Sequence, residues 1–480
     1  MISDIKPFKI IDNLYFVGSH RASCHMLATG EGLILIDTGY PGDGEALKES
    51  IEALGFSVNE VKIIIHSHGH RDHSGASSEI VKMSGAKTYL NFNDKKYIKD
   101  LEIDYDIKDG DVIRLGETEI LALHTPGHTE GTVSLFFNVS ENGKTYRVGM
   151  FGGGGTNQLK KAYMRAKNVN YLYRGEFYKS IDRLKKEKVD IFIGNHTWHN
   201  DTEGKAKLIG KSEVNPFVDN SAFSKFLAKL ENNMNKVIEE DQEIDFVNYA
   251  HRGASEYRPE NTMESFRLGL EMGANGIETD VHITKDGVPV LFHDNTLDRV
   301  TNGTGSITQY TYDELCALDV IKGDYREKIP TFREFLDEFA QRDITFAIEL
   351  KQWGTAEIVI DILREYNLQS KCVITSFSYN ELKKALAYGK EFRLGHLTSD
   401  VSDEHINELI EDGISEICPK ASLIIENPEL VEKWHKLGLN VRAWGVSNEE
   451  IMKGVFEAGV DGMTVNFPDK LTALINENKS

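Results

Sequence analysis

The first half of the chain, from Phe8 to about Ile193, contains short apolar segments that are separated by polar turns. Such segments predict strands, and a helical stretch interrupts them before further helix-like stretches follow. Strands on both sides of a helix indicate layered sheets that are covered by helices. The segments expected to carry strands are 8–18, 32–39, 61–68, 88–92, 118–127, 132–139 and 145–152.

From Phe246 onward, short apolar strands alternate with amphipathic helices. Repeated strand–helix units predict a parallel sheet, and about eight of them predict a closed barrel. The sequence offers nine strand candidates, which is one too many for such a barrel. They are 246–251, 276–283, 288–293, 346–350, 372–377, 393–397, 414–419, 439–444 and 462–466.

The surplus strand is explained by an Asp-Gly turn at residues 284–287. Two strands joined by so short a turn form an antiparallel hairpin, because a parallel pair needs a longer crossover. If this dipeptide is a two-residue loop, Lys285 faces Val288. Counting outward then places Asp280 opposite His293, so we expect this carboxylate and imidazole to lie a few ångströms apart.

A chain of 480 residues exceeds what one hydrophobic core usually organises, so two or three domains are expected. Residues 221–240 have apolar positions at helical spacing and lead into the acidic run 239–243, which suits a linker. The boundary is therefore expected near residues 241–245. One domain then covers residues 1–242 and the other covers residues 246–480.

Acidic side chains outnumber basic ones and give a formal net charge of −21, which disfavours nonspecific binding to nucleic acid or anionic membranes. The four cysteines, Cys24, Cys316, Cys372 and Cys418, form no CxxC pair and favour thiols in a reducing compartment. The sequence contains neither a signal-peptide pattern nor an apolar run of transmembrane length. We therefore expect a cytoplasmic protein with no membrane insertion and no nucleic-acid partner. The oligomeric state stays open, a homo-oligomer included.

A histidine-rich cluster follows the strand expected at 61–68. His68 and His70 are two residues apart in extended backbone, so they point to one side, whereas Asp72 and His73 open the next helix. This spacing is typical of a metal site, because solvated histidines have no reason to collect beside an aspartate. Three neutral imidazoles bind Zn²⁺ and leave a position for water, whose pKa falls to about 7.

Three motifs together resemble the metallo-β-lactamase superfamily over about residues 5–240: HxHxDH from His68, HTPGHTEGT around His128 and IFIGNHTWHN around His196. The resemblance implies an αββα sandwich and a hydrolase in which metal-activated water attacks a carbonyl or phosphoryl centre. It places Asp37, in the upstream LIDTG, as a carboxylate behind the metal ligands. It implies two zinc positions, the first held by His68, His70 and His128 and the second by Asp72, His73 and His196.

The chain departs from most members of that superfamily at residues 152–155. An aspartate that bridges both metals is usual there, whereas this chain has four glycines and no carboxylate. The β-lactamase subclass that also lacks this aspartate binds two zincs through the six ligands just named, so the domain resembles that subclass. Loss of an anionic bridge weakens metal binding, which leaves one zinc or two as alternatives. His66 and His199 are expected to be packing residues, with a place in the pocket as the alternative for His199.

Charged residues of the second half fall at the carboxyl ends of expected strands, where the active sites of such barrels form. Glu278 and Asp280 share one side of their strand, as Glu349 and Lys351 share one side of theirs. Three carboxylates at one barrel mouth suit a hard cation, Mg²⁺ or Ca²⁺. Arg252 and Lys351 supply the positive charge that binds a phosphate.

The motifs HRG, PENT, ExD, HD and ELK, in this order, resemble the glycerophosphodiester phosphodiesterase family over about residues 246–470. The resemblance implies an α/β protein with a (β/α)₈ TIM barrel. It also implies hydrolysis of a small phosphodiester to glycerol 3-phosphate and an alcohol such as choline or ethanolamine. By this resemblance His251 and His293 form the acid/base pair. It implies metal ligands at Glu278, Asp280 and Glu349, and substrate contacts at Arg252, Glu260 and Lys351.

Other residues near the barrel mouth carry weaker signals. Trp444 suits packing against the glycerol moiety of a substrate, and a place in the barrel core is the alternative. The motif TD-x-P of the family is here Thr464-Val-Asn466-Phe-Pro468, with asparagine in place of aspartate, which we expect to be a supporting position. His282 and His396 are expected to have packing roles.

These patterns favour a bifunctional metal-dependent hydrolase of lipid metabolism, in which a zinc hydrolase is joined to a glycerophosphodiester phosphodiesterase. The two sites are suited to successive bonds of one lipid-derived substrate. β-Lactams, lactones, thioesters and phosphodiesters all suit the chemistry of the first domain. Two alternatives stay open: the first domain is a noncatalytic binding module, or it is a true β-lactamase beside an inert barrel.

Overall fold

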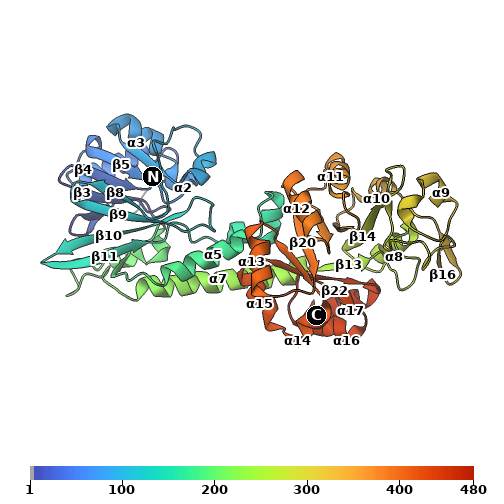
Figure 1. Ribbon diagram of the computed structural model, residues 1–480. Helices are drawn as coiled ribbons and strands as arrows, with labels where there is room; N and C mark the ends of the chain where they lie inside the picture. Colours follow the sequence, from blue (N-terminus) through green and yellow to red (C-terminus); the bar gives the residue numbers. More distant parts are fainter. Residues whose placement is uncertain (1–4, 480) are drawn as a thin grey trace. The chain divides into compact units, whose positions relative to one another are not determined.

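The computed structural model describes residues 5–479, which form two compact units (Figure 1). One unit extends to Leu159 and includes Glu176–Val237, and the other comprises Lys160–Gly175 and the residues from Ile238 onward. The expected outer limits of the two domains, residues 1 and 480, lie outside the described residues. Across residues 5–479, no helix combines the length and apolar character that crossing a bilayer requires.

The N-terminal unit contains two β-sheets. Among the described residues, the first sheet has seven strands in the order β1-β2-β3-β4-β5-β6-β7, and the second has five in the order β12-β11-β10-β9-β8. The first sheet consists of β1 (Phe8–Ile11), β2 (Leu14–Phe16), β3 (His25–Thr29), β4 (Gly32–Ile36), β5 (Val61–Ile65), β6 (Lys87–Leu90) and β7 (Tyr105–Asp106). The second consists of β8 (Asp111–Leu115), β9 (Thr118–His124), β10 (Val133–Glu141), β11 (Lys144–Met150) and β12 (Ile191–Phe192).

Helices cover the outer faces of both sheets. The helical segments that lie wholly or partly in this unit are α1 (Gly44–Ala53), η1 (Val58–Glu60), α2 (Arg71–Ser74), α3 (Ser77–Ser84), η2 (Phe92–Tyr97), η3 (Asn157–Leu159), α5 (Tyr173–Leu184), η4 (Thr197–His199), α6 (Thr202–Ala206) and α7 (Ala222–Asp245). Apolar residues of α1 and α3 pack against β3, β4 and β5. Phe137 of β10 lies in the core between the sheets, whereas Phe136 faces outward and contacts Phe223 of α7. The predicted αββα sandwich is therefore confirmed.

The strands differ in detail from those that the apolar pattern predicts. Segment 8–18 is not one strand but two, β1 and β2, which pair antiparallel around Asp12. The φ of 44° at Asp12 lies in the left-handed region, which reverses the chain. The pattern does not indicate β3, β7 and β8, because HMLAT, YD and DVIRL are short or interrupted by polar residues.

The second unit is a closed barrel, as its strand–helix pattern predicts. In the described chain its sheet has nine strands, of which β15 alone is antiparallel to its neighbour. The parallel strands are β13 (Val247–His251), β14 (Gly276–Ile283), β18 (Thr345–Leu350), β19 (Cys372–Ser376), β20 (Arg393–Thr398), β21 (Glu416–Pro419), β22 (Asn440–Val446) and β23 (Gly462–Val465). The barrel closes because β13 pairs in parallel with both β14 and β23.

Amphipathic helices surround the barrel and bury their apolar faces against its strands. They are α8 (Met263–Glu271), α10 (Phe332–Phe339), α11 (Ala356–Glu365), α12 (Tyr379–Tyr388), α13 (Asp403–Glu411), α14 (Ala421–Glu426), α15 (Glu429–Lys436), α16 (Glu449–Glu457) and α17 (Pro468–Lys479). A second, smaller cluster of buried apolar residues lies in the part of the chain between β15 and α10. This part contains η5 (Ile307–Gln309), α9 (Tyr312–Cys316), β16 (Val320–Lys322) and β17 (Tyr325–Glu327). The sequence pattern did not indicate the short β16–β17 hairpin.

The hairpin of β14 and β15 (Pro289–Leu291) is antiparallel as predicted, but its register differs by one residue. The amide of Phe292 donates to the carbonyl oxygen of Asp280 over 3.0 Å, so Asp280 faces Phe292 and not His293. The predicted two-residue loop is wrong. Gly287, with φ 84°, adds a third loop residue in the left-handed region, a frequent alternative in hairpins.

The acidic run expected to be a linker forms the last turns of α7, which continues to Asp245. Asp241 of this run is buried because it pairs with Arg174. Residues 160–175, which include α4 (Lys161–Ala166), precede the expected boundary but pack in the second unit. There Lys161 Nζ donates to Asp461 Oδ1 over 2.6 Å. The domain limits 1–242 and 246–480 stay a prediction.

Candidate metal centres

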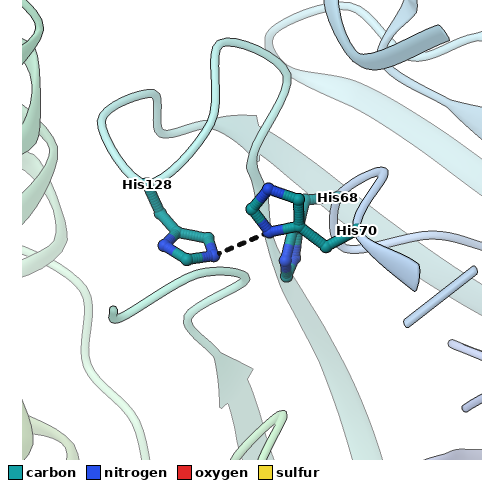
Figure 2. Close-up of side chains that lie close together, drawn as sticks. All are labelled: His68, His70 and His128. Carbon is teal, nitrogen blue, oxygen red and sulfur yellow. Dashed lines mark hydrogen bonds between the residues drawn. The ribbon is translucent and has the colours of Figure 1, made fainter. Parts of the chain in front are cut away.

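The first cluster of histidines lies after the buried strand β5, in the N-terminal unit. The chain leaves β5 at His66 and enters α2 at Arg71. His68 and His70 project from this loop, and His128 projects from the loop after β9 (Figure 2). Their ring centroids are 4.8–4.9 Å apart, and Nδ1 of His70 lies 3.1 Å from Nε2 of His128.

The three remaining predicted ligands lie beside this trio. Nε2 of His73 is 3.4 Å from Oδ2 of Asp72, and Nε2 of His196 is 3.7 Å from the same oxygen. Two groups have ligand atoms within 4.8 Å of one another: His68, His70 and His128, and His68, Asp72 and His73. The fold thus brings together all six residues that the resemblance assigns to zinc.

Neighbouring groups hold the second ring nitrogen of each histidine. These contacts are Ser67 Oγ for His68 (3.1 Å), Gln158 Nε2 for His70 (3.1 Å), the Gly155 carbonyl for His128 (2.8 Å), Asp37 Oδ2 for His73 (2.9 Å) and the Arg21 carbonyl for His196 (3.0 Å). Carbonyl and carboxylate oxygens only accept hydrogen bonds, so Nδ1 of His128, His73 and His196 carries the proton. In each of these three rings Nε2 is then the atom that can bind a metal.

The donor atoms fit a bound cation. Nε2 of His68 and Nε2 of His73 are buried and have no hydrogen-bond partner. A buried, unpaired nitrogen is costly unless a ligand satisfies it. A set of five imidazoles and one carboxylate suits Zn²⁺.

The electrostatics of the cluster favour neutral imidazoles at most positions. Burial lowers the pKa of His68 well below its ordinary value and lowers the pKa of His128 to about 3. At His73 burial also acts to lower the pKa, but Asp37 and Asp72 raise it to about 9. A metal at His73 therefore has to displace a proton, which makes binding at this position dependent on pH.

Asp94 lies beside the first candidate metal position, although no sequence motif indicates it. Its buried carboxylate accepts hydrogen bonds from the Gly69 amide (2.8 Å), the Gly131 amide (2.8 Å) and the Thr129 hydroxyl (2.7 Å). Gly69 and Thr129 each adjoin a histidine that is predicted to bind zinc. Asp94 therefore ties the two ligand-bearing loops to each other and to η2.

The glycines that replace the bridging aspartate are required by packing. A Cβ at Gly152 would lie 1.9 Å from the Val133 carbonyl oxygen, and a Cβ at Gly153 would lie 2.7 Å from the His128 ring. The Asn195 side chain donates to the Gly152 carbonyl over 2.6 Å. The segment therefore approaches His128 through its backbone and has no room for a carboxylate at these two positions.

The two histidines expected to have packing roles differ. His66 is bonded on both sides, with Nδ1 2.9 Å from the Tyr89 carbonyl and Nε2 2.6 Å from Ser77 Oγ. This contact set is that of a packing residue. His199 lies against His196, with ring centroids 5.2 Å apart, and its buried Nδ1 has no hydrogen-bond partner. It therefore lies in the wall of the site.

The second cluster lies level with the carboxyl ends of β13 and β18, where Glu278 and Asp280 occupy the middle of the longer strand β14. Carboxylate oxygens of Glu278, Asp280 and Glu349 lie within 4.8 Å of one another, and all three side chains are buried. Burial raises the pKa of Glu278 well above its ordinary value and raises the pKa of Glu349 to about 7. Oδ1 of Asp280 is buried without a hydrogen-bond partner. Three crowded, buried carboxylates fit a divalent cation.

Two cationic side chains border these carboxylates. Lys351 Nζ donates to Glu349 Oε1 over 2.7 Å and lies 3.6 Å from Asp280 Oδ1. Arg252 Nη1 donates to Glu260 Oε1 over 2.9 Å, and its Nε lies 3.2 Å from Asp280 Oδ2. Burial acts to raise the pKa of Asp280, but Arg252 and then Lys351 hold it well below its usual range.

The two histidines of the barrel are each held at Nδ1. Nδ1 of His251 donates to Oδ1 of Asn466 over 2.6 Å, which leaves Nε2 free, 3.9 Å from Glu278 Oε2. Nδ1 of His293 lies 2.6 Å from Oδ1 of Asp294. Burial lowers the pKa of His251 to about 4 and lowers the pKa of His293 from its ordinary value.

Arg299 is a second residue that sequence motifs do not indicate. Its Nη2 donates to Glu260 Oε1 over 2.7 Å, and its Nε donates to Asp294 Oδ2 over 2.6 Å. Glu260 also binds Arg252, and Asp294 also holds His293. Arg299 therefore links the residue expected to bind phosphate with one of the acid/base histidines.

Asn261 contacts Asp280, one of the predicted metal ligands, and does not cap the helix that follows it. The N-cap of α8 is Thr262, whose side chain accepts from the Ser265 amide. With φ 57°, Asn261 turns inward and donates through Nδ2 to Asp280 Oδ2 over 2.9 Å. Asparagine tolerates this left-handed conformation better than most residues.

The remaining predicted residues lie near the mouth or beside it. Trp444, at the end of β22, is half-buried and meets the exposed Phe377 edge-on, with ring centroids 5.0 Å apart. Its indole Nε1 is buried without a hydrogen-bond partner. His282 Nε2 lies 3.3 Å from the His293 carbonyl, and His396 Nδ1 lies 2.9 Å from His405 Nε2, which are packing contacts.

Comparisons with known proteins divide along the same two units. The model of the metallo-beta-lactamase superfamily matches residues 17–140, and that of the glycerophosphoryl diester phosphodiesterase family matches residues 251–470. These matches and the fold define a metallo-β-lactamase domain fused to a phosphodiesterase-type barrel. A glycerophosphodiester phosphodiesterase of Caldanaerobacter subterraneus subsp. tengcongensis is 35% identical over 237 residues, which are 48% of this chain and 97% of that protein. The chain belongs to the glycerophosphoryl diester phosphodiesterase family.

Further similar proteins include a glycerophosphodiester phosphodiesterase of Bacillus altitudinis, 32% identical over 244 residues, which are 48% of this chain and 98% of that protein. Two solved structures resemble the N-terminal unit. The native FEZ-1 metallo-β-lactamase from Legionella gormanii has a TM-score of 0.47 and 28% identity, covering 50% of this chain and 98% of that one. BJP-1, a subclass B3 metallo-β-lactamase of Bradyrhizobium japonicum, has a TM-score of 0.46 and 25% identity, covering 50% and 96%.

Proposed function

We propose that the barrel hydrolyses glycerophosphodiesters to glycerol 3-phosphate and an alcohol. The observation that carries this proposal is the convergence of three buried carboxylates, within 4.8 Å, beside two cationic side chains. Glu278, Asp280 and Glu349 would hold one Mg²⁺ or Ca²⁺. When bound, the cation supplies a Lewis acid for a phosphoryl oxygen.

The partners of the two histidines support different roles for them. His251 donates to a neutral amide, so its ring stays neutral and its Nε2 can accept a proton from the attacking hydroxyl. His293 is paired with the Asp294 carboxylate, which acts to raise the pKa of this histidine against burial and stabilises its protonated form. His251 is therefore the base, and His293 is the acid that protonates the leaving alcohol.

Arg252 and Lys351 bind and orient the phosphodiester. Both are close enough to Asp280 to share a ligand that lies over the carboxylates. The planar guanidinium of Arg252 is fixed by Glu260, so it presents its remaining N–H groups in one direction. Trp444 would cover the apolar part of the substrate beside Phe377.

Hydrolysis of glycerophosphocholine by the full chain tests this proposal, with glycerol 3-phosphate as the product measured. We expect His251→Ala to lose about 10²–10⁴-fold in rate, which is the usual contribution of a general base. His70→Ala, in the other unit, is the matched control and should keep the wild-type rate. Full activity in His251→Ala would contradict the assignment.

We also propose that the N-terminal unit is a zinc hydrolase. His68, His70 and His128 would hold one zinc, and Asp72, His73 and His196 would hold another. Supporting this are the buried Nε2 of His68, which has no hydrogen-bond partner, and the buried Nε2 of His73, whose nearest charged neighbour is the predicted ligand Asp72 at 3.4 Å. When bound, zinc lowers the pKa of water to about 7 and so supplies a nucleophile at neutral pH.

The zinc content of the full chain tests this second proposal. Two zinc ions in the wild type, and fewer in His70→Ala, are the expected result of elemental analysis. A wild type without zinc after exposure to excess Zn²⁺ would favour a noncatalytic binding module instead. Hydrolysis of a chromogenic cephalosporin that is lost in His70→Ala would favour a true β-lactamase.

A further inference from the structure

The two clusters differ in the groups that surround them. In the barrel, Arg252 and Lys351 contact the carboxylates, as binding of a phosphodiester anion requires. The groups that hold the histidine cluster are neutral or acidic, namely Ser67, Gln158, Asp37 and the carbonyls of Gly155 and Arg21. None of these contacts involves the side chain of an arginine or lysine, so the centre of the histidine cluster is suited to a carbonyl group that carries no charge.

Aromatic rings stand on two sides of this cluster. Tyr97 of η2 meets His70 edge-on, with ring centroids 5.1 Å apart. Trp198 of η4 stacks on His196, with centroids 4.3 Å apart and planes inclined by 11°. Tyr97 is 39% exposed, with Lys96 Nζ 5.4 Å from its ring centroid, and Trp198 is 59% exposed, so Trp198 offers the more open apolar face to a ligand.

The position of Tyr97 is fixed by the same residue that ties the ligand loops together. Asp94 lies three residues before Tyr97 in η2 and accepts hydrogen bonds from both ligand loops. Burial of this carboxylate with three donors anchors η2 at the edge of the cluster. The residue that connects the two ligand loops therefore also holds Tyr97 beside the histidine cluster.

We propose that the N-terminal unit is a carboxylic ester hydrolase that removes the acyl chain from a monoacylated glycerophosphodiester, and thereby supplies the substrate of the barrel. This inference rests on the proposed functions of both units. Tyr97 and Trp198 would hold the acyl chain. Arg21, an exposed cation whose carbonyl oxygen accepts from His196, would face the phosphodiester of that substrate.

The two reactions follow from the chemistry of the substrate. The oxygen of water forms a bond to the ester carbonyl carbon, and the bond from that carbon to the glycerol oxygen breaks. The proton from water passes to the glycerol oxygen. The products are a fatty acid and an unacylated glycerophosphodiester. An unacylated glycerophosphodiester of this kind is the substrate proposed for the barrel.

The test uses the full chain with 1-palmitoyl-glycerophosphocholine as the probe. We expect palmitate first and glycerol 3-phosphate afterwards. His251→Ala should release palmitate at the wild-type rate and accumulate glycerophosphocholine. His70→Ala should release neither product from this probe, but should cleave added glycerophosphocholine at the wild-type rate.

Failure of the inference is distinct from failure of the proposed functions. A wild type that cleaves glycerophosphocholine and binds zinc, but releases no palmitate, would overturn the ester hydrolase. Release of palmitoyl-glycerol phosphate as the first product would also overturn it, because the barrel would then act on the acylated compound. No cleavage of glycerophosphocholine would instead refute the function proposed for the barrel.

A binding experiment tests the acyl site without turnover. The probe is 1-O-hexadecyl-glycerophosphocholine, whose ether bond is not hydrolysed, and the readout is tryptophan fluorescence. We expect saturable quenching in the wild type that is lost in Trp198→Phe. In turnover, Trp198→Ala should raise KM for the palmitoyl probe about tenfold, as loss of an aromatic contact implies. Tyr325→Ala, an exposed aromatic of the barrel unit, should change neither value; unchanged quenching in Trp198→Phe would contradict the assignment.

Discussion

Nδ1 of His251 donates to Oδ1 of Asn466 over 2.6 Å, and Ser255 Oγ donates to the same oxygen over 3.0 Å. The acceptor is an amide oxygen, so it fixes the tautomer of the imidazole without adding negative charge. The motif of the family places aspartate at this position. The asparagine therefore favours a neutral His251, as the proposed role of this residue as the base requires.

Replacing this amide by a carboxylate should shift the pH dependence of the barrel. In Asn466→Asp the new charge raises the pKa of His251 from about 4, by about 1–3 units for a close ion pair. A base must be unprotonated, so the acidic limb of kcat/KM moves to higher pH by the same amount. The measurement is the pH–rate profile for glycerophosphocholine.

Asn466→Leu serves as the control for this experiment. It removes the acceptor without adding charge, so it should lower kcat and leave the acidic limb without an upward shift. An unchanged limb in Asn466→Asp would contradict the role of His251 as the base.

The sequence indicated the site residues that belong to short motifs. It did not indicate Asp94, whose role depends on hydrogen bonds to residues far away in the chain. His68, His70, Asp72 and His73 fall within six residues, so spacing alone indicated a metal site. The contacts of Asp94 span up to 37 residues, which no local pattern records.

In the barrel, the sequence likewise predicted the strands but not the register of the hairpin. Strand–helix alternation predicted the eight parallel strands, because burial makes most of their residues apolar. The register of the β14–β15 hairpin depended on the conformation of Gly287, and composition does not distinguish a two-residue loop from a three-residue loop. Asp280 was therefore placed opposite the wrong residue.

Asp94→Asn should weaken zinc binding in the N-terminal unit. Its carboxylate accepts three hydrogen bonds, and the amide group of asparagine would face at least one of these donors with another donor. Partners that orient metal ligands are typically worth about 10–100-fold in affinity, so we expect a loss in that range. Competition with a chelator measures it.

The matched control is Asp100→Asn, an exposed aspartate near the same segment that accepts only from Ser78. It should leave the affinity for zinc unchanged. Equal affinities in Asp94→Asn and the wild type would show that Asp94 has no role in positioning the ligands.

Arg299 should affect both binding and turnover in the barrel. Arg299→Ala frees Glu260, which orients Arg252, and frees Asp294, which holds His293. We expect KM to rise and kcat to fall, each by about tenfold, the effect of losing one well-placed charged hydrogen bond. Steady-state kinetics on glycerophosphocholine separate the two parameters.

Arg299→Lys should restore little of this loss, because an ammonium group cannot bridge two carboxylates in the planar geometry of a guanidinium. Arg326→Ala is the control, since this exposed arginine binds only backbone carbonyls. Wild-type kinetics in Arg299→Ala would mean that Glu260 and Asp294 hold their positions without it.

Asp461→Asn should destabilise the barrel unit. The buried Asp461 accepts from Lys161 (2.6 Å), His435 (2.8 Å) and the Val441 amide (2.7 Å), so its removal leaves the buried Lys161 unpaired. Breaking a buried ion pair costs about 3–5 kcal/mol. Urea denaturation followed by tryptophan fluorescence measures this, because Trp353, Trp434 and Trp444 all lie in the barrel unit.

The destabilisation should depend on pH in a defined direction. Burial acts to raise the pKa of Asp461, but His435 and Lys161 hold it well below its usual range. A depressed pKa contributes stability above the unfolded value of about 3.9, and this contribution is lost as the pH falls further. The difference between wild type and Asp461→Asn should therefore be full at pH 7 and shrink below about pH 4. Glu432→Gln, which breaks the exposed pair with Lys436, should cost less than about 0.5 kcal/mol; an equal cost for both variants would contradict the buried network.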